Sequence, residues 1–401
     1  MTGTAMSRQL KFSVGLLTLC QALANCANVI LVTTSALVGY MLSPDKSLAT
    51  LPMAFQLAST AASTVPASMI MKAIGRRTGF IIGALCGMSG GLLGAWAILE
   101  QQFVLFILAT SLMGIANGFA MYYRFAAADM VPATAKATAI SWVVAGGIIA
   151  AIIGPEIAKR THDLFTNAEF AGTYLALGFL PVLAIIVLAV VRITEPVENK
   201  AADGGRTFSE LFRQPAFPVA LFGGMVGYGV MSFIMTATPL AMQQRGYDFS
   251  NTAFVIQWHV LGMFGPSLFT GHIIRRVGVL PVMLAGAVLE ITCVAVNISG
   301  TEVWQFWTAL FCLGLGWNFL YVGSSTLLTE CYRPEERSRV QALNEFSTFG
   351  TVAISSFSAG AVHHLFGWNV INMATLPLLS LVTLAIILLM LHRRRTAQTA
   401  H

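Results

Sequence analysis

The sequence has few charged residues, since Asp, Glu, Lys and Arg together make up 10% of its 401 residues. Soluble domains carry about 25% charged residues, whereas 56% of this chain is hydrophobic and its mean hydropathy is +0.74. A soluble fold of this length could not bury so much apolar surface. The chain is therefore expected to lie in a lipid bilayer. Its formal net charge of +6 reflects short basic loops rather than a nucleic-acid partner.

The sequence also lacks two patterns that carry chemistry in other proteins. Its six cysteines include no Cys-x-x-Cys pair and nearly all fall inside apolar runs, so no structural disulfide is expected. It contains no Gly-x-x-x-x-Gly-Lys-Ser/Thr loop for the phosphates of ATP, and nothing in it resembles an enzyme. Any transport would be driven by a gradient or run as facilitated diffusion, and no cofactor is expected.

Apolar runs of about 20 residues, the length that crosses a hydrocarbon core roughly 30 Å thick, recur along the whole chain. They predict twelve transmembrane helices, at about 12–42, 48–72, 78–99, 102–127, 134–158, 170–193, 215–243, 252–274, 279–299, 303–330, 339–363 and 369–392. An even number of spans places both termini on the same side of the membrane.

The basic residues support this count and give an orientation. Of the 23 Lys and Arg residues, only Lys46, Lys159, Arg160 and Arg245 fall on the side opposite to the predicted termini. Because basic residues concentrate in cytoplasmic loops, both termini are expected in the cytoplasm, and the protein is expected to be a multi-pass monomer. Adding or removing one helix would destroy this separation.

A polar segment divides the chain into two similar halves. Residues 194–214 are predicted to form a cytoplasmic linker between a six-helix bundle at 1–193 and a second at 215–401, which ends in a short basic tail. The pattern that begins at Ser68 and ends at Gly75 returns from Gly271 to Gly278, with a constant offset of 203 residues. Parallel six-helix repeats are one of the known transporter architectures.

Here the chain resembles the major facilitator superfamily, whose signature after the second helix is Gly-x-x-x-Asp-Arg/Lys-x-Gly-Arg/Lys-Arg/Lys. The chain keeps Gly75, Arg76 and Arg77 but has Ser68 at the first glycine and Lys72 at the aspartate. The resemblance implies an all-α membrane protein with twelve transmembrane helices in two six-helix bundles, and transport by alternating access. The latch that the family's aspartate forms at the cytoplasmic gate is not carried over to Lys72.

Two residue pairs stand out in the seventh and eighth predicted helices. Met231 and Met235 are four residues apart, as are His259 and Met263, so each pair lies on one helical face. If the two helices are antiparallel, Met231 is expected opposite Met263 and Met235 opposite His259. The sequence midpoint of both pairs is residue 247, inside the loop predicted at 244–251. The pairs would then lie at matching depths near the middle of the bilayer, where transporters of this kind bind their substrates.

Thioether sulfur is a soft, uncharged ligand that suits Cu(I), and imidazole also binds copper. Together Met231, Met235, His259 and Met263 resemble the pattern of the CcoA-like bacterial copper importers, which supply copper for cytochrome oxidase assembly. The resemblance implies that these four residues bind copper as the transported substrate. Alternatively, the methionines fill irregular helix contacts and His259 hydrogen-bonds a nearby carbonyl.

Two other functions stay open. In the first, the substrate is an organic solute such as riboflavin. It would bind among aromatic and amide side chains that include Asn25, Tyr228, Trp258 and Trp317. A third interpretation is a scaffold or sensor of the same fold that does not transport.

Five charged residues are further candidates for a gate or for coupling. Glu290 lies in the middle of a predicted span, and an ionisable group there is a candidate for function. Arg124, Asp129, Glu330 and Glu345 lie near the predicted cytoplasmic ends of helices, where opposite charges pair across a gate or simply extend into the aqueous interface.

Overall fold

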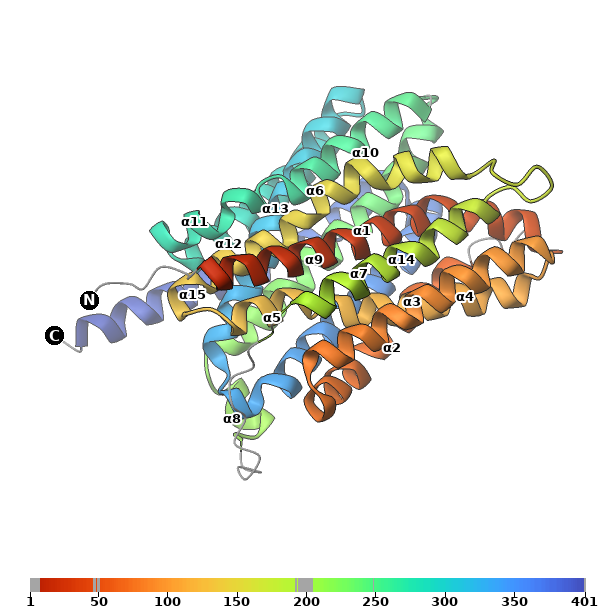
Figure 1. The fold of residues 1–401 in the computed structure, drawn as a ribbon. Coiled ribbons are helices and arrows are strands. Elements are labelled where there is room, and N and C mark those ends of the chain that lie inside the picture. Colours follow the sequence, from red (N-terminus) through yellow and green to blue (C-terminus); the bar gives the residue numbers. More distant parts are fainter. Residues whose placement is uncertain are drawn as a thin grey trace. The chain divides into compact units, whose positions relative to one another are not determined.

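The computed structural model describes residues 8–45, 48, 51–191, 193, 205–247 and 249–399. Residues 194–204 of the predicted linker, and the chain ends 1–7 and 400–401, lie outside these ranges. Two compact units make up the chain (Figure 1). Unit 1 consists of residues 1–132, 142–196 and 338–349, and unit 2 consists of residues 133–141, 197–337 and 350–401.

Throughout the described ranges the secondary structure is helical, without a strand. Most of unit 1 consists of α1 (Arg8–Leu42), α2 (Leu51–Ile74), α3 (Arg76–Leu99), α4 (Phe103–Ala120), α5 (Tyr123–Asp129), α7 (Ala171–Val190) and the larger part of α6 (Lys136–Thr161). Unit 2 contains η2 (Ala133–Ala135), α8 (Phe208–Phe212), α9 (Ala216–Gln244), α10 (Phe249–Phe264), α11 (Ser267–Val277), α12 (Val279–Ser299), α13 (Val303–Cys331), η3 (Pro334–Glu336), α15 (Leu376–Thr399) and most of α14 (Arg337–Met373).

All twelve predicted spans fall on helices. In the described part of the chain, nine helices are long and apolar enough to cross a membrane. The other three predicted spans correspond to α2, to α10 with α11, and to the first part of α14. The all-helical membrane fold predicted from the sequence is therefore confirmed.

Several spans differ from the prediction in their details. The span predicted at 102–127 is divided into α4 and α5, and α14 continues through the loop predicted at 364–368 as far as Met373. The span predicted at 252–274 is broken between α10 and α11 at Gly265 and Pro266, because proline has no N–H for the helical ladder and its ring crowds the preceding turn. The last helix runs to Thr399, so the predicted basic tail is helical. No glycine or proline follows residue 392 to end the helix earlier.

Two glycines end helices at matching positions of the sequence repeat. Gly75 precedes α3 with φ 86°, and Gly278 precedes α12 with φ 92°. Residues with a Cβ rarely adopt this left-handed backbone, which explains why glycine occurs at both positions. The repeat recognised in the sequence thus reproduces the same sharp turn in each unit.

Close helix packing in unit 1 depends on small residues along α3. A Cβ added at Gly91 would lie 2.3 Å from the backbone nitrogen of Gly178 on α7, and one at Gly94 would lie 2.5 Å from the ring of Tyr174. Glycine allows helix backbones to approach closely in membrane proteins. Figure 1 shows α2, α3 and α4 side by side, in agreement with their packing against one another.

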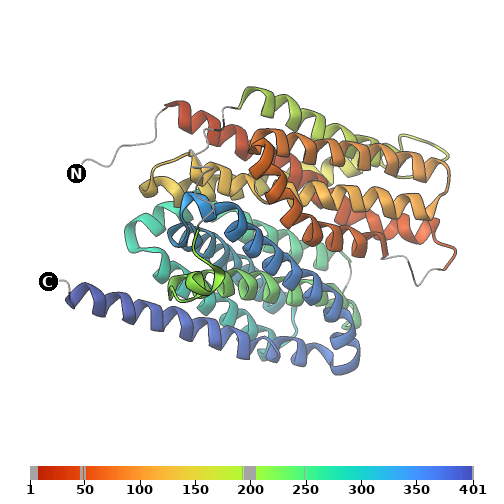
Figure 2. The same ribbon diagram turned by 90° about the horizontal axis from the view of Figure 1, so that it is seen from below.

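Helix α13 is the centre of unit 2, since α9, α10 and α12 all pack against it. Gly314 allows α10 to approach, because an added Cβ would lie 2.4 Å from the carbonyl oxygen of His259. Gly316 does the same for α12, where an added Cβ would lie 2.8 Å from Cγ of Glu290. Helix α15, dark blue in Figure 2, lies along α9 and α12.

Each unit contains a short segment from the opposite half of the sequence. Residues 338–349, at the start of α14, belong to unit 1, where Ser68 Oγ donates a hydrogen bond to the carbonyl of Ser338 at 2.6 Å. Residues 133–141, around the start of α6, belong to unit 2, where the N–H of Gly271 donates to Ser141 Oγ at 3.1 Å. Ser68 and Gly271 are the matching first positions of the sequence repeat, so the two exchanges are equivalent.

Candidate functional site

The four residues predicted to bind metal lie on two helices of unit 2. Met231 and Met235 belong to α9, where Met231 is buried and Met235 is half-buried. His259 and Met263 belong to α10 and both are buried. The i, i+4 spacing therefore places each pair on one helical face, as predicted.

The His259 side chain is directed towards α13. Its Nδ1 lies 2.7 Å from the carbonyl oxygen of Leu310, and its Nε2 is buried without a hydrogen-bond partner among the described residues. Helices α9 and α10 each pack against α13 much more extensively than against each other. Within the described part of the chain, no three His, Cys, Asp or Glu side chains gather as a metal site, so a metal here would depend on methionine sulfur.

Four aromatic side chains form a second candidate site in unit 2, here called the Trp317 cluster: Tyr228, Phe264, Trp317 and Tyr321. The rings of Trp317 and Tyr321, one turn apart on α13, stack with centroids 4.9 Å apart and an interplanar angle of 16°. Tyr228 from α9 packs edge-on against both rings, at 5.2 Å and 5.3 Å.

The Trp317 cluster contains a buried polar group without a hydrogen-bond partner among the described residues. Trp317 is 2% exposed, and its indole N–H has no hydrogen-bond partner among the described residues. Buried indole N–H groups usually find a partner. The cluster also has a half-buried edge, formed by Tyr228 and Phe264. A flat ring can stack at this half-buried edge, and it can accept a hydrogen bond from Trp317 only in a conformation that uncovers the indole N–H.

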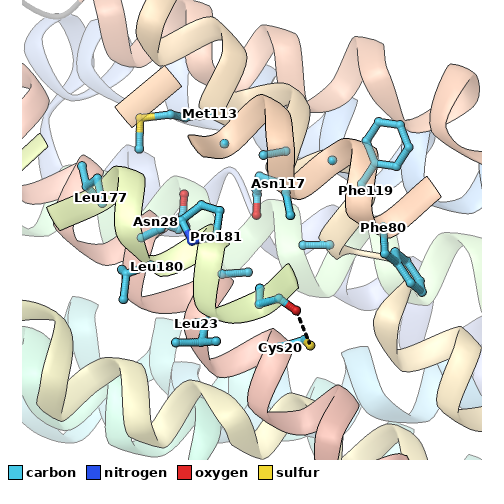
Figure 3. Close-up of a pocket in the computed structure, with 18 of the residues that line it drawn as sticks. Cys20, Leu23, Asn28, Phe80, Met113, Asn117, Phe119, Leu177, Leu180 and Pro181 are labelled. Atoms are coloured by element: carbon cyan, nitrogen blue, oxygen red, sulfur yellow. Dashed lines mark hydrogen bonds between the residues drawn. The ribbon is translucent and has the colours of Figure 1, made fainter. Parts of the chain in front are cut away.

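Unit 1 contains a pocket between α1, α3, α4 and α7 (Figure 3). Its walls are mostly apolar, and its few polar side chains include Asn28, Gln56 and Asn117. The amide of Gln56 donates to Asn28 Oδ1 at 3.2 Å, whereas Gln56 Oε1 is buried without a partner among the described residues. The cavity measures about 60 Å³, which is room for a few water molecules rather than for an organic solute.

The charged residues predicted to form a gate make defined ion pairs. In unit 1, Arg124 contacts Glu345 at 2.5 Å, and their side chains are 3% and 0% exposed. Arg76 contacts Asp129 at 2.8 Å in the same unit, and it also donates to Gln341 at 2.9 Å. Glu345 and Gln341 both lie on the segment 338–349. Lys72, at the family's aspartate position, is exposed, and the carboxylate that contacts Arg76 belongs to Asp129.

Glu330 and Glu290 do not belong to buried ion pairs among the described residues. Glu330 pairs with Arg393 at 2.9 Å, and both side chains are more than 40% exposed, so this pair is an ordinary surface contact. Glu290 lies in the middle of α12 with no exposed surface, and both of its carboxyl oxygens are without a hydrogen-bond partner among the described residues.

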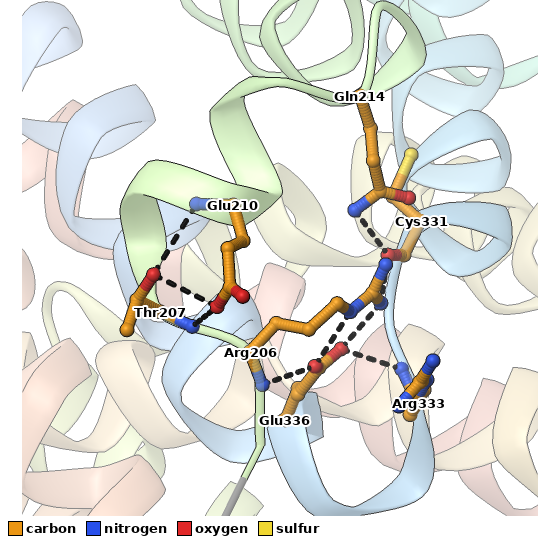
Figure 4. Close-up of polar contacts among 7 residues, drawn as sticks. All are labelled: Arg206, Thr207, Glu210, Gln214, Cys331, Arg333 and Glu336. Atoms are coloured by element: carbon orange, nitrogen blue, oxygen red, sulfur yellow. Dashed lines mark hydrogen bonds and ion pairs between the residues drawn. The ribbon is translucent and has the colours of Figure 1, made fainter.

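The partly buried ion pair of Arg206 and Glu336 was not predicted from the sequence. Arg206, in the linker, donates from Nη2 to Glu336 Oε2 at 2.6 Å and from Nε to Oε1 at 2.8 Å, while its Nη2 also reaches the carbonyl of Cys331 (Figure 4). Burial by itself raises the pKa of Glu336, but hydrogen bonds from Arg206 and from the backbone of Arg333 outweigh it and hold the pKa at about 2. The spacing of 130 residues gives no local signal that would have revealed this pair.

The fold defines a class, the polytopic helical membrane proteins. A family model described as Major Facilitator Superfamily matches residues 17–289 and 258–401. The chain belongs to the Major Facilitator Superfamily, as the resemblance in the sequence implied.

Relatives and solved structures agree with this family. The riboflavin transporter RfnT of Brucella anthropi is 39% identical over 378 residues, which cover 94% of this chain and 95% of the relative. An uncharacterised transporter of the same superfamily, YdeG of Bacillus subtilis, is 26% identical over 82% of this chain and 80% of its own. The structure of FucP in its outward conformation has a TM-score of 0.76 at 14% identity, covering 95% of this chain and 99% of FucP. That last likeness concerns the fold alone.

Proposed function

We propose that this protein transports riboflavin, or a similar flat aromatic solute with polar substituents, by alternating access. The proposal is supported by RfnT, which is similar along nearly the whole length of both chains. The copper importers that the four predicted metal ligands resemble find no support among these relatives. The organic solute, an alternative from the sequence, is therefore the better interpretation.

The Trp317 cluster is the observation that carries this proposal. The isoalloxazine ring of riboflavin is flat and carries oxygen and nitrogen acceptors at its edge. An aromatic pair contributes about 0.5–1.5 kcal/mol beyond its buried area, and a buried donor without a partner costs about 1–3 kcal/mol. A ring that stacks at this cluster and accepts the indole hydrogen bond gains from both effects.

The proposed orientation places both termini in the cytoplasm of a bacterial cell, with the protein in the inner membrane. It is supported by the unequal distribution of basic residues between the two sets of loops. The direction of net transport does not follow from this orientation.

The test is counterflow of labelled riboflavin in proteoliposomes that contain the purified full-length protein. Counterflow requires no gradient and tolerates either orientation of the protein in the liposome. We expect exchange in the wild type and none in empty liposomes. Trp317→Phe keeps a ring but removes the N–H, so we expect the apparent affinity to fall about tenfold, equivalent to about 1.4 kcal/mol.

The matched control is Trp304→Phe at the start of α13. Trp304 is 58% exposed, and its N–H already donates to Glu302 Oε2 at 2.9 Å. We expect riboflavin exchange by this variant to equal that of the wild type. Equal affinity of Trp317→Phe and wild type would show that Trp317 does not bind the solute. No exchange by well-folded wild-type protein would refute riboflavin as the substrate.

Copper is the second candidate substrate, because of the geometry of His259. A metal-ligating histidine usually donates its other ring N–H to a carbonyl or carboxylate, and the contact of Nδ1 with Leu310 has this form, with Nε2 left unpartnered. Labelled Cu(I) in the same proteoliposomes tests this function. Copper uptake that His259→Leu and Met231→Leu abolish, with riboflavin exchange unchanged, would support a metal site.

A further inference from the structure

We propose that Glu290 is the proton-binding residue that couples transport to a proton gradient. One proton would bind its carboxylate from one side of the membrane and leave the carboxyl to the other side in each cycle. The residue is regenerated unchanged, and the net result is the movement of one proton with each solute. The inference rests on the proposed function for the solute used to measure it and for the binding of that solute at Trp317.

The first observation is the environment of the Glu290 carboxyl group. It lies in the interior of α12 (Val279–Ser299), a helix of the predicted membrane span, and has no exposed surface. Neither oxygen has a hydrogen-bond partner among the described residues, and no salt bridge satisfies the group. A buried carboxylate without a partner is strongly unfavourable. The proton is therefore held on the carboxyl group in this conformation.

The second observation is its position beside the Trp317 cluster. Gly316, the residue before Trp317, is the point on α13 that contacts Glu290, because an added Cβ would lie 2.8 Å from Glu290 Cγ and 3.1 Å from its backbone nitrogen. A movement of α13 that accompanies solute binding at Trp317 would therefore act directly on the contact that keeps the carboxyl group dry. Water that enters this contact would allow the proton to leave.

The neighbouring titratable groups do not provide a charge partner. Cys293, one turn further along α12, is a thiol near the carboxyl group, and Cys312 on α13 is in turn near Cys293. On the helices that pack on α12, the acidic residues, basic residues and histidines lie towards helix ends: Arg245 follows α9, His272, Arg275 and Arg276 belong to the second half of α11, Glu330 lies at the end of α13, and His392, Arg393, Arg394 and Arg395 belong to the last turns of α15. The tyrosines that lie away from the helix ends are Tyr228 on α9 and Tyr321 on α13. Glu290 thus exchanges its proton without a fixed counter-charge.

A purely structural role fits these contacts poorly. Asn297, two turns along α12, makes the kind of bond that joins helices, since its amide donates to Asn372 Oδ1 at 2.8 Å. Glu290 makes no such bond. An ionisable group that contributes no polar contact in this conformation is explained by a role in a different conformation, in which it becomes hydrated.

The experiment compares driven accumulation with exchange in proteoliposomes. With a proton gradient imposed across the membrane, we expect the wild type to accumulate labelled riboflavin several-fold, and Glu290→Gln to accumulate none. Without a gradient, we expect counterflow by Glu290→Gln to stay within about twofold of the wild type. A trapped pH dye should report proton movement on addition of riboflavin in the wild type and none in Glu290→Gln. Glu100→Gln, which changes an exposed carboxylate, is the matched control and should behave like the wild type.

Three outcomes would overturn the proposal. They are accumulation by Glu290→Gln equal to that of the wild type, failure of the exchanging wild type to accumulate riboflavin under a proton gradient, and loss of both counterflow and accumulation in a folded Glu290→Gln variant. Failure of the wild type to exchange riboflavin would refute the proposed substrate instead. In that case the protonation of Glu290 is tested by the melting temperatures of the purified wild type and of Glu290→Gln at different pH values. Because ionisation would bury an unpaired charge, the wild type should lose stability relative to Glu290→Gln as the pH rises from about 5 to about 9. Parallel curves would overturn the proposal.

Discussion

Gly91 shows how much of the packing depends on the absence of one methyl group. Its hypothetical Cβ would lie 2.3 Å from the backbone nitrogen of Gly178, and a backbone atom cannot move aside as the end of a side chain can. We expect Gly91→Ala to force α3 and α7 apart and to lower the stability by about 2 kcal/mol, within the range for overpacked cores. Thermal unfolding in detergent measures the effect.

The matched control is Gly350→Ala in α14. A Cβ at Gly350 would meet nothing within 4 Å, and alanine favours a helix interior over glycine by up to about 1 kcal/mol. We therefore expect an unchanged or slightly higher melting temperature. Similar melting temperatures for the two variants would show that the close approach of α3 and α7 at Gly91 does not contribute to the stability.

Glu336 gives a prediction about pH. Its pKa of about 2 lies below the ordinary value of 4.5, so the folded state binds the proton less well than the unfolded state. The stability that the Arg206 contact contributes is then complete above about pH 4.5 and is lost as the pH falls towards 2.

We expect Glu336→Gln to lower the stability by about 2 kcal/mol, the value of a hydrogen-bonded charge. Its melting temperature should differ from that of the wild type by a constant amount between pH 5.5 and pH 8. A difference that disappears within this range would mean that Glu336 is not ionised as described.

The start of α14 is an element that depends on buried charge. Removing one partner of a buried ion pair leaves an uncompensated charge and costs about 3–5 kcal/mol, whereas replacing both partners by apolar residues is often neutral. We expect Arg124→Leu and Glu345→Leu each to lower the melting temperature strongly, and the double variant to recover most of the loss. A double-mutant cycle measures this coupling.

The exposed pair of Arg160 and Glu156, with side chains 76% and 49% exposed, serves as the control for that cycle. Exposed pairs contribute little, so we expect no measurable coupling there. Equal coupling in the two cycles would show that burial adds nothing to the pair of Arg124 and Glu345. If this pair also acts as a gate, the single variants will exchange solute with altered rates while the double variant partly recovers.

At the scale of the whole molecule, the orientation can be tested with two single cysteines. Asp163 lies in the loop between α6 and α7, and Ser209 lies in α8 after the linker, and both are exposed. We expect Asp163→Cys to react with a membrane-impermeant maleimide in intact cells, and Ser209→Cys to react only after the cells are opened. Reaction of both from outside would refute the proposed topology. The parent protein, with its native cysteines, gives the background.

Much of the fold could be predicted because the bilayer imposes simple rules. The thickness of the membrane sets the length of the apolar runs, which therefore predict the spans. The left-handed turns before α3 and α12 explain the repeated glycines at Gly75 and Gly278. The break at Gly265 and Pro266 was missed because proline is tolerated within many membrane helices. The exchanged segments were also missed, because their hydrogen bonds join residues such as Ser68 and Ser338, 270 positions apart, and no periodicity reports such contacts.

The candidate sites were predicted less completely. The four-residue spacing in the Met231 pair and in the His259 pair was sufficient to place each pair on one helical face. It did not show that the His259 side chain is directed at Leu310. Trp317 and Tyr321 are one turn apart, a signal that the sequence contained and that predicts the stack. The substrate could not be derived from four residues, since similarity along the whole chain favours an organic solute over the metal.

The exchanged segments make each half of this protein depend on the other. Without residues 338–349, Arg124 and Asp129 lose the contacts that Glu345 and Gln341 provide, and without residues 133–141, Gly271 loses its bond to Ser141. Neither half is therefore a self-sufficient folding unit, although each contains six of the twelve predicted spans. Two copies of one half would meet this deficit only by exchanging their segments, as a domain-swapped homodimer does.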